Sequence, residues 1–183
     1  MAPVTVATSE SHPIRVDFVA DDVVLEPGRI GMTFAPGKRD RGVFANWKRD
    51  LGADLARLRD HYGADVLVSL IEDHELELLA IPDLFARATE RGLVSIRLPI
   101  RDGSVPSSLE ELRGLVGQIL ERVRSGETVV IHCRGGLGRT GLLAACCLVA
   151  LGRAPGAAIA AVRRARHGTI ETAEQEAWVH AFV

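Results

Sequence analysis

Three short runs rich in apolar residues, each followed by a helical pattern, constrain the fold of this chain more than any other feature. The runs are residues 64–71 (ADVLVSLI), 93–100 (LVSIRLPI) and 128–132 (TVVIH). Strands that are apolar on both sides are typical of a sheet buried between helices, and strands that alternate with helices pair in parallel. We therefore expect an α/β protein, a three-layer fold with a mainly parallel central sheet flanked by helices.

The rest of the chain continues this alternation. Residues 14–36 mix apolar runs with turn residues and predict two or three short strands, and Asn46 is expected to cap a helix that extends to about His61. No repeat or linker divides the chain, so residues 1–183 are expected to form a single domain whose polar residues 1–12 are mobile. Further helices are predicted at 75–90, interrupted at Pro82, from Ser107 or Ser108 to Gly126, and at 139–151, 155–166 and 172–182.

Composition excludes several classes of protein. The 183 residues carry 22 basic and 24 acidic side chains, and the net charge of −2 gives no long-range attraction to nucleic acid or to an anionic membrane. The most apolar stretch, 142–151, is too short to span a bilayer, and no signal-peptide pattern is visible at the N-terminus. The three cysteines, Cys133, Cys146 and Cys147, form neither a disulfide framework nor a zinc motif, so we expect a cytoplasmic location.

One segment carries the chemistry. Residues 131–141 (IHCRGGLGRTG) place a glycine-rich loop between a predicted buried strand and a predicted buried helix. Such a loop presents backbone N–H groups and the positive end of a helix to an anion. Cys133 opens the loop and puts a thiol at the floor of this cradle. Arg139 closes it with a guanidinium, which matches a phosphoryl group in shape and charge.

The same surroundings activate the thiol. Cysteines at helix N-termini or beside arginine are commonly ionised at neutral pH, so we expect Cys133 to attack phosphorus as a thiolate. The hydroxyl of Thr140 is expected to donate a hydrogen bond to this thiolate when it departs in the second step. The expected phosphate-binding residues are those of the loop: Arg134, Gly135, Gly136, Leu137, Gly138 and Arg139.

Residues 132–140 resemble the signature loop of the protein tyrosine phosphatase superfamily, His-Cys-x5-Arg-Ser/Thr, at every defined position. The Gly-Gly-Leu-Gly filling of the loop, the segment 99–107 (PIRDGSVPS) and the Pro-Gly-Lys segment 36–38 are similar to the kinase-associated phosphatase branch of the dual-specificity enzymes. The resemblance covers roughly residues 25–183, densely around the loop and thinly elsewhere. It implies a cysteine-dependent phosphomonoesterase that needs no metal or organic cofactor and acts on a phosphorylated protein or peptide.

The resemblance also implies site residues outside the loop. Family members protonate the leaving oxygen with an aspartate on a mobile loop, and Asp102 lies at the corresponding distance before Cys133. In the second step, two glutamines of the family help to place the attacking water. Gln175 matches the second of them and is expected to position water, whereas Glu171 departs from the first. Because its charge would be repelled by a phosphoryl group, we expect Glu171 to point away.

Some residues allow two interpretations of their role. Gly136, Gly138 and Gly141 spell a dinucleotide-binding pattern, which we reject because no acidic residue follows at the distance that ribose binding requires. Asp73 is an alternative acid beside Asp102, or else a carboxylate at a helix start.

The remaining candidates are expected to be structural. His132 should shape the loop rather than bind a metal, and Cys146 and Cys147 should pack as small apolar residues. Tyr62 is expected to lie away from the site, so that a shallow pocket also accepts phosphoserine or phosphothreonine. The basic cluster is expected to be a solvated face, with recruitment of an acidic phosphoprotein surface as the alternative; it comprises Lys38, Arg39, Arg41, Lys48 and Arg49.

Three other functions compete with a protein phosphatase. A module with this fold could bind phosphate without turnover, but the intact set of Cys133, Arg139 and Asp102 argues against it. A phosphatase of a small non-protein phosphoester remains an alternative. A sulfur- or arsenic-handling cysteine enzyme is disfavoured by Asp102 and by Thr140 after the arginine.

Overall fold

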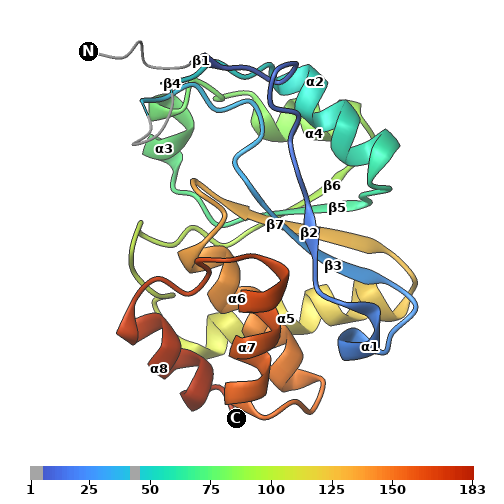
Figure 1. The fold of residues 1–183 in the computed structure, drawn as a ribbon, viewed down its shortest axis with the longest axis vertical. Coiled ribbons are helices and arrows are strands. Elements are labelled where there is room, and N and C mark those ends of the chain that lie inside the picture. The colour runs from blue at the N-terminus through green and yellow to red at the C-terminus, as the bar shows by residue number, and fades with distance from the viewer. Residues whose placement is uncertain (1–5, 42–45) are drawn as a thin grey trace.

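The computed structural model describes residues 6–41 and 46–183 and shows a five-stranded sheet between two layers of helices (Figure 1). The strand order is β2-β3-β7-β5-β6, and all neighbours pair in parallel except β2, which is antiparallel to β3. The prediction of a mainly parallel sheet flanked by helices is confirmed. The strands of this sheet are β2 (Asp17–Phe18), β3 (Arg29–Phe34), β5 (Val66–Ser69), β6 (Val94–Arg97) and β7 (Thr128–Cys133).

Helices α2, α3 and α4 cover one face of the sheet, and α5 to α8 cover the other (Figure 1). The helices are α1 (Asp21–Val24), α2 (Leu51–Ala56), which continues as the π-helix η1 (Arg57–His61), α3 (Asp73–Leu78), α4 (Leu84–Glu90), α5 (Leu109–Arg124), α6 (Gly138–Ala150), α7 (Pro155–Ala165) and α8 (Ala173–Ala181). None of these helices combines the length and the apolar character that crossing a membrane requires.

The centre of the sheet carries the core and leads to the glycine-rich loop. Val129, Val130 and Ile131 of β7 are fully buried, because strands pair with β7 on both sides and helices cover both faces. The helix that follows, α6, is also buried all round, as its apolar sequence predicts. The loop between them therefore emerges at the carboxyl end of a central strand, where α/β proteins bind their ligands.

The predicted helix start at Asn46 is wrong. Asn46 and Trp47 form the short strand β4 (Asn46–Trp47), which pairs in parallel with β1 (Val6–Ala7). The helix begins at Leu51, because the carboxylate of Asp50 accepts a hydrogen bond of 2.7 Å from Ala53 N and caps it.

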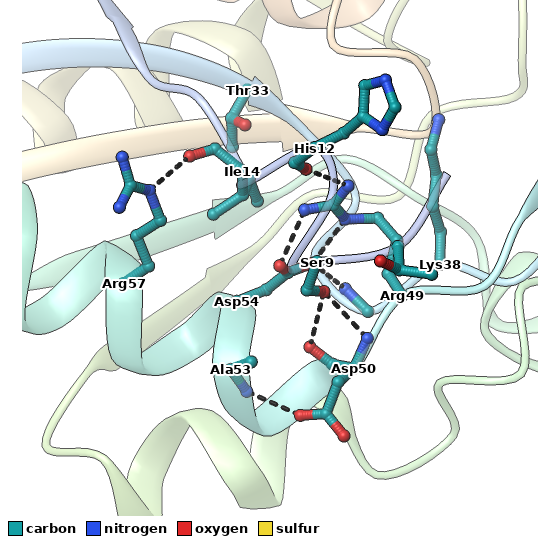
Figure 2. A network of polar contacts seen from close by, with 12 residues as sticks. Ser9, His12, Ile14, Thr33, Lys38, Arg49, Asp50, Ala53, Asp54 and Arg57 are labelled. Carbon is teal, nitrogen blue, oxygen red and sulfur yellow. Dashed lines mark hydrogen bonds and ion pairs between the residues drawn. The ribbon is translucent and has the colours of Figure 1, made fainter. Parts of the chain in front are cut away.

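Of the residues expected to be mobile, residues 6–12 make defined contacts with the rest of the fold, while residues 1–5 lie outside the described part of the chain. Ser9 Oγ accepts a hydrogen bond of 2.9 Å from Asp50 N. Arg49 donates to the carbonyl oxygen of His12 at 2.7 Å and forms a two-pronged ion pair with Asp54 at 2.7 and 2.9 Å (Figure 2). A polar network thus ties the N-terminal segment to α2.

This network also corrects the prediction of a solvated basic face. Arg49 is fully buried and its charge is matched by the buried Asp54. Lys38 is also buried, and its Nζ lies over the rings of both Phe34 and Trp47, 4.8 and 4.6 Å from their centroids. The other members of the cluster, Arg39, Arg41 and Lys48, are exposed.

Candidate active site

The loop between β7 and α6 encloses the sulfur of Cys133. The Cys133 side chain is 3% exposed, and the backbone N–H of Gly136 donates to Sγ at 3.2 Å. Gly136 has a φ of +71°, and a Cβ at this position would lie 2.2 Å from the carbonyl oxygen of Thr33 on β3. Glycine is therefore required here both for the backbone conformation and for the close approach of the loop to the sheet.

The carbonyl oxygens of the loop are held from outside, which leaves its amides for an anion. All four carbonyls from residue 134 to residue 137 accept hydrogen bonds, whereas the amides of Gly135 and Leu137 donate to no other described residue. This is the arrangement expected of a loop that binds phosphate through N–H groups. The donors are Ala35 N and Lys38 Nζ to Arg134 O, Arg166 to Gly135 O and Gly136 O, and Gly141 N and Ile170 N to Leu137 O.

Arg139 lies beneath the loop with one unused donor. Its guanidinium is 1% exposed and donates to Glu75 at 2.7 and 3.0 Å, to the carbonyl oxygen of Ile100 at 2.7 Å and to Asp102 Oδ1 at 2.8 Å. Its buried Nε has no partner among the described residues. Burial alone would lower the pKa of Arg139, but the hydrogen bonds to Glu75 and the nearby negative charges raise it, so the guanidinium stays charged.

Glu75, on α3, is a site residue that the sequence analysis missed. It is 2% exposed, and its carboxylate also accepts a hydrogen bond of 2.9 Å from Glu72 N. Burial would raise the pKa of Glu75, but the hydrogen bonds from Arg139 and from the backbone of Glu72 outweigh this and hold the pKa below its ordinary value. Asp73, the alternative to Asp102 as the acid, is paired with Arg97 at 2.5 Å and is largely exposed.

Asp102 lies on the loop between β6 and α5, next to Gly103, whose φ is +72°. Its carboxylate is 60% exposed and reaches Arg139 at the site. The buried side chain of Gln175 holds this loop, because its Nε2 donates to the carbonyl oxygen of Ser104 at 3.1 Å. The structure thus places Asp102 against Arg139, which closes the loop that Cys133 opens.

Glu171 lies against the start of α6, contrary to the expectation that it points away. A Cβ at Gly138 would lie 2.4 Å from Glu171 Oε2, so the absent side chain of Gly138 makes room for this carboxylate. Ile170, directly before it, has a φ of +60°, which is a strained conformation for a β-branched residue. Gln175 Oε1 accepts a hydrogen bond of 2.9 Å from Glu171 N and fixes this turn.

Two buried polar atoms of the loop's flanking residues, Thr140 Oγ1 and His132 Nε2, lack partners among the described residues, so the expected hydrogen bond from Thr140 to the thiol is not made in this structure. Burial lowers the pKa of His132 to about 4, so its ring is neutral, and its Nδ1 lies 3.3 Å from the carbonyl oxygen of Cys133. The other two thiols are buried on α6, and burial raises the pKa of Cys146 to about 12 and that of Cys147 still further. These two cysteines are unreactive core residues.

Aromatic side chains also flank the loop, a feature that the sequence analysis did not expect. Tyr62 packs against Phe18, away from the thiol. Phe34, however, is the register partner of Cys133 in the sheet, and its ring lies 5.5 Å from that of Trp47. Both rings are only partly buried.

Comparison with known proteins identifies relatives of this chain. The family model described as a DSP-PTPase phosphatase of polymorphic toxin systems matches residues 42–153. Cyclin-dependent kinase inhibitor 3 of Rattus norvegicus is 28% identical over 179 residues, which are 96% of this chain and 82% of the relative.

Solved structures of two phosphatases are similar to this chain over most of its length. Kinase-associated phosphatase with its catalytic cysteine replaced by serine superimposes with a TM-score of 0.84 at 26% identity, over 93% of this chain and 94% of that one. Tk-PTP in its active form superimposes with a TM-score of 0.71 at 30% identity, over 91% of this chain and 95% of that one.

Proposed function

The chain belongs to the DSP-PTPase phosphatase family and is a cysteine-dependent protein phosphatase, and we propose that Cys133 is its nucleophile and that residues 1–183 form one phosphatase domain. One observation carries the assignment of the nucleophile. The Cys133 sulfur lies at the floor of a loop whose carbonyl oxygens are engaged on the outside, and it already accepts a hydrogen bond from Gly136 N. A phosphoryl group on this sulfur would meet the free amides of the loop.

In the first step, the thiolate of Cys133 attacks phosphorus and the bond from phosphorus to the leaving oxygen breaks. The loop amides and the free Nε of Arg139 hold the non-bridging oxygens of the phosphoryl group. Asp102 gives its proton to the leaving oxygen, a transfer that typically contributes ~10²–10⁴-fold. For this it must leave Arg139, with which it is paired here, and its exposed position permits the movement.

In the second step, water attacks phosphorus and the bond from sulfur to phosphorus breaks. The carboxylate of Asp102 accepts a proton from this water, and the electron pair returns to the sulfur of Cys133. The Gly136 amide stabilises the thiolate that leaves. The buried hydroxyl of Thr140 has no partner among the described residues, and we propose that it turns to donate to the sulfur in this step. Gln175 supports this step by holding the loop of Asp102 through Ser104.

We propose that the substrate is a phosphorylated protein or peptide. The names of two relatives, cyclin-dependent kinase inhibitor 3 and kinase-associated phosphatase, connect those proteins to kinases. The partly buried rings of Phe34 and Trp47 next to the loop offer an apolar wall for a phosphotyrosine ring. A family of dual-specificity type predicts turnover of phosphothreonine as well.

The test is hydrolysis of p-nitrophenyl phosphate and of phosphotyrosine and phosphothreonine peptides, with chelator present, by the wild type and by Cys133→Ser. We expect turnover by the wild type, and binding of phosphopeptide without turnover by the variant. Turnover that persists in Cys133→Ser would refute the nucleophile. Binding without turnover by the reduced wild type would favour a phosphate-binding module, and hydrolysis of only the small ester would favour a non-protein substrate.

A further inference from the structure

An arginine at the end of α7 holds the outside of the phosphate-binding loop. Arg166 Nε donates to the carbonyl oxygen of Gly136 at 2.7 Å, and one of its terminal nitrogens donates to that of Gly135 at 3.3 Å. The guanidinium is planar and its donors have fixed directions, so one side chain sets the orientation of two consecutive peptide groups. Turning these carbonyls outward is what leaves the adjoining amides for a phosphoryl group.

Arg166 is held in turn by a residue from the other end of the chain. Its remaining terminal nitrogen donates to Asp17 Oδ2 at 2.7 Å. The side chains of Arg166 and Asp17 are only 13% and 10% exposed. A cation this buried needs a counter-charge. Without Asp17, the free energy of the guanidinium would be lower in solvent, so Arg166 would turn away from the loop.

The position of Asp17 is itself well fixed. Asp17 lies on β2, opposite Met32 of β3, and β3 is the strand whose Thr33 touches Gly136. Figure 2 shows how the segment before it is held beside α2. The carbonyl oxygen of His12 accepts a hydrogen bond from Arg49, just before α2, and that of Ile14 accepts one from Arg57 of η1. The strand pairing and these hydrogen bonds therefore fix the position of the Asp17 carboxylate relative to the loop.

Neither partner of this pair belongs to the segment that the family model matches, residues 42–153. Among the residues that the structure describes, the Asp17 carboxylate has one other partner, Arg15, whose side chain lies 2.6 Å away but is 76% exposed. An ion pair this exposed contributes little, so the buried partner Arg166 is the one that depends on Asp17.

We propose that Asp17 is a positioning residue of this phosphatase: through Arg166 it fixes the carbonyls of Gly135 and Gly136, and thereby the amides that hold the phosphoryl group. The proposal rests on the proposed function, because it concerns the same loop. It assigns a role in phosphate binding to the N-terminal strand, which contributes no group that touches the substrate.

The test compares Asp17→Asn with Arg15→Ala as the matched control, because both substitutions break the pair between residues 15 and 17 but only the first removes the charge facing Arg166. Asparagine has the same shape as aspartate and can still accept a hydrogen bond. We expect Asp17→Asn to lower kcat/KM for p-nitrophenyl phosphate about fivefold and to raise the inhibition constant of inorganic phosphate by a similar factor. For Arg15→Ala, both kcat/KM and the inhibition constant of phosphate should stay within about twofold of the wild-type values.

A second pair of variants tests the route through Arg166. Arg166→Lys keeps the charge but cannot hold two carbonyls and the carboxylate together. If Asp17 acts through Arg166, adding Asp17→Asn to Arg166→Lys should lower kcat/KM by less than a further twofold. Thermal unfolding of every variant is measured alongside, because a purely structural role would lower Tm without changing the phosphate inhibition constant well below Tm.

Equal kinetics for Asp17→Asn and Arg15→Ala would overturn the proposal. So would an equal loss of kcat/KM from Asp17→Asn in the wild type and in Arg166→Lys. An Asp17→Asn chain that does not fold would also overturn it, since the pair would then be a folding element. Failure of the proposed function is distinguishable, because in that case the wild type itself would neither hydrolyse the ester nor bind phosphate.

Discussion

The ion pair between Glu75 and Arg139 gives the sharpest test of how this site is held together. Both side chains are almost fully buried, and the carboxylate uses both oxygens, at 2.7 and 3.0 Å. Glu75→Gln keeps the shape but removes the charge, and its amide nitrogen would face an N–H group of Arg139. Removing one partner of a buried pair leaves an unmatched charge and typically costs ~3–5 kcal/mol.

For a chain of 183 residues this loss corresponds to a Tm lower by roughly 10 °C. Urea unfolding followed by circular dichroism measures the free energy directly. The matched control is Asp73→Asn, on the same helix, which breaks the pair with Arg97 at 2.5 Å. Because that pair is exposed, its loss should cost below ~1 kcal/mol. Equal losses for Glu75→Gln and Asp73→Asn would refute the view that burial makes the pair with Arg139 important.

The dependence on pH provides an independent check. Hydrogen bonds from Arg139 and Glu72 hold the pKa of Glu75 below its ordinary value of 4.5, despite its burial. A lowered carboxyl pKa stabilises the folded state above the ordinary pKa, and this stabilisation disappears as pH falls through the lowered one. The difference in unfolding free energy between the wild type and Glu75→Gln should therefore be constant at neutral pH and shrink in acid below pH 4.5.

Three further predictions concern the rim and the outside of the loop. Asp102→Asn should lower kcat by ~10²–10⁴-fold for esters with poor leaving groups and by much less for p-nitrophenyl phosphate; equal losses with both would contradict the acid role. Glu171→Gln should tighten inhibition by inorganic phosphate about two- to fivefold, since it removes a negative charge beside Gly138; unchanged inhibition would show that this carboxylate does not sense the bound anion. Burial lowers the pKa of Lys38 from 10.5 to about 8, so the unfolded chain binds more protons between these values and stability should rise with pH there. Lys38→Met should lose this rise, as thermal unfolding at several pH values would measure.

The sequence predicts most of the regular structure where local signals agree with the tertiary fold. Ser108 caps α5, and Thr172 caps α8 in a reciprocal pair with Gln175. These caps depend on residues three apart in the chain, so the sequence contains the whole interaction. Asn46 failed as a cap because tertiary pairing recruited it into β4, and Asp50 was available nearer the helix.

The site was predictable as far as it depends on contiguous residues. The loop from Cys133 to Arg139 is such a case, whereas Glu75 lies 64 residues before Arg139 and is indistinguishable in sequence from its acidic neighbours. The direction of Glu171 was equally hidden, since it depends on the left-handed backbone at Ile170 and on the space above Gly138. Pairings across the fold of this kind leave no local pattern.

The engaged carbonyls on the outside of the loop have a consequence for selectivity. Residues 134–137 are anchored to the residues that follow β3, to the end of α7 and to the turn before α8, so neighbouring elements fix the shape of the cradle. Phosphate binding then requires little ordering of the chain, and a rigid ring of backbone amides treats every phosphoryl group alike. Discrimination between one phosphorylated partner and another must arise at the edge of the site, from side chains such as Glu171 and the partly buried rings of Phe34 and Trp47. Exchanging those residues among relatives would redirect the enzyme to new substrates while its chemistry stayed the same.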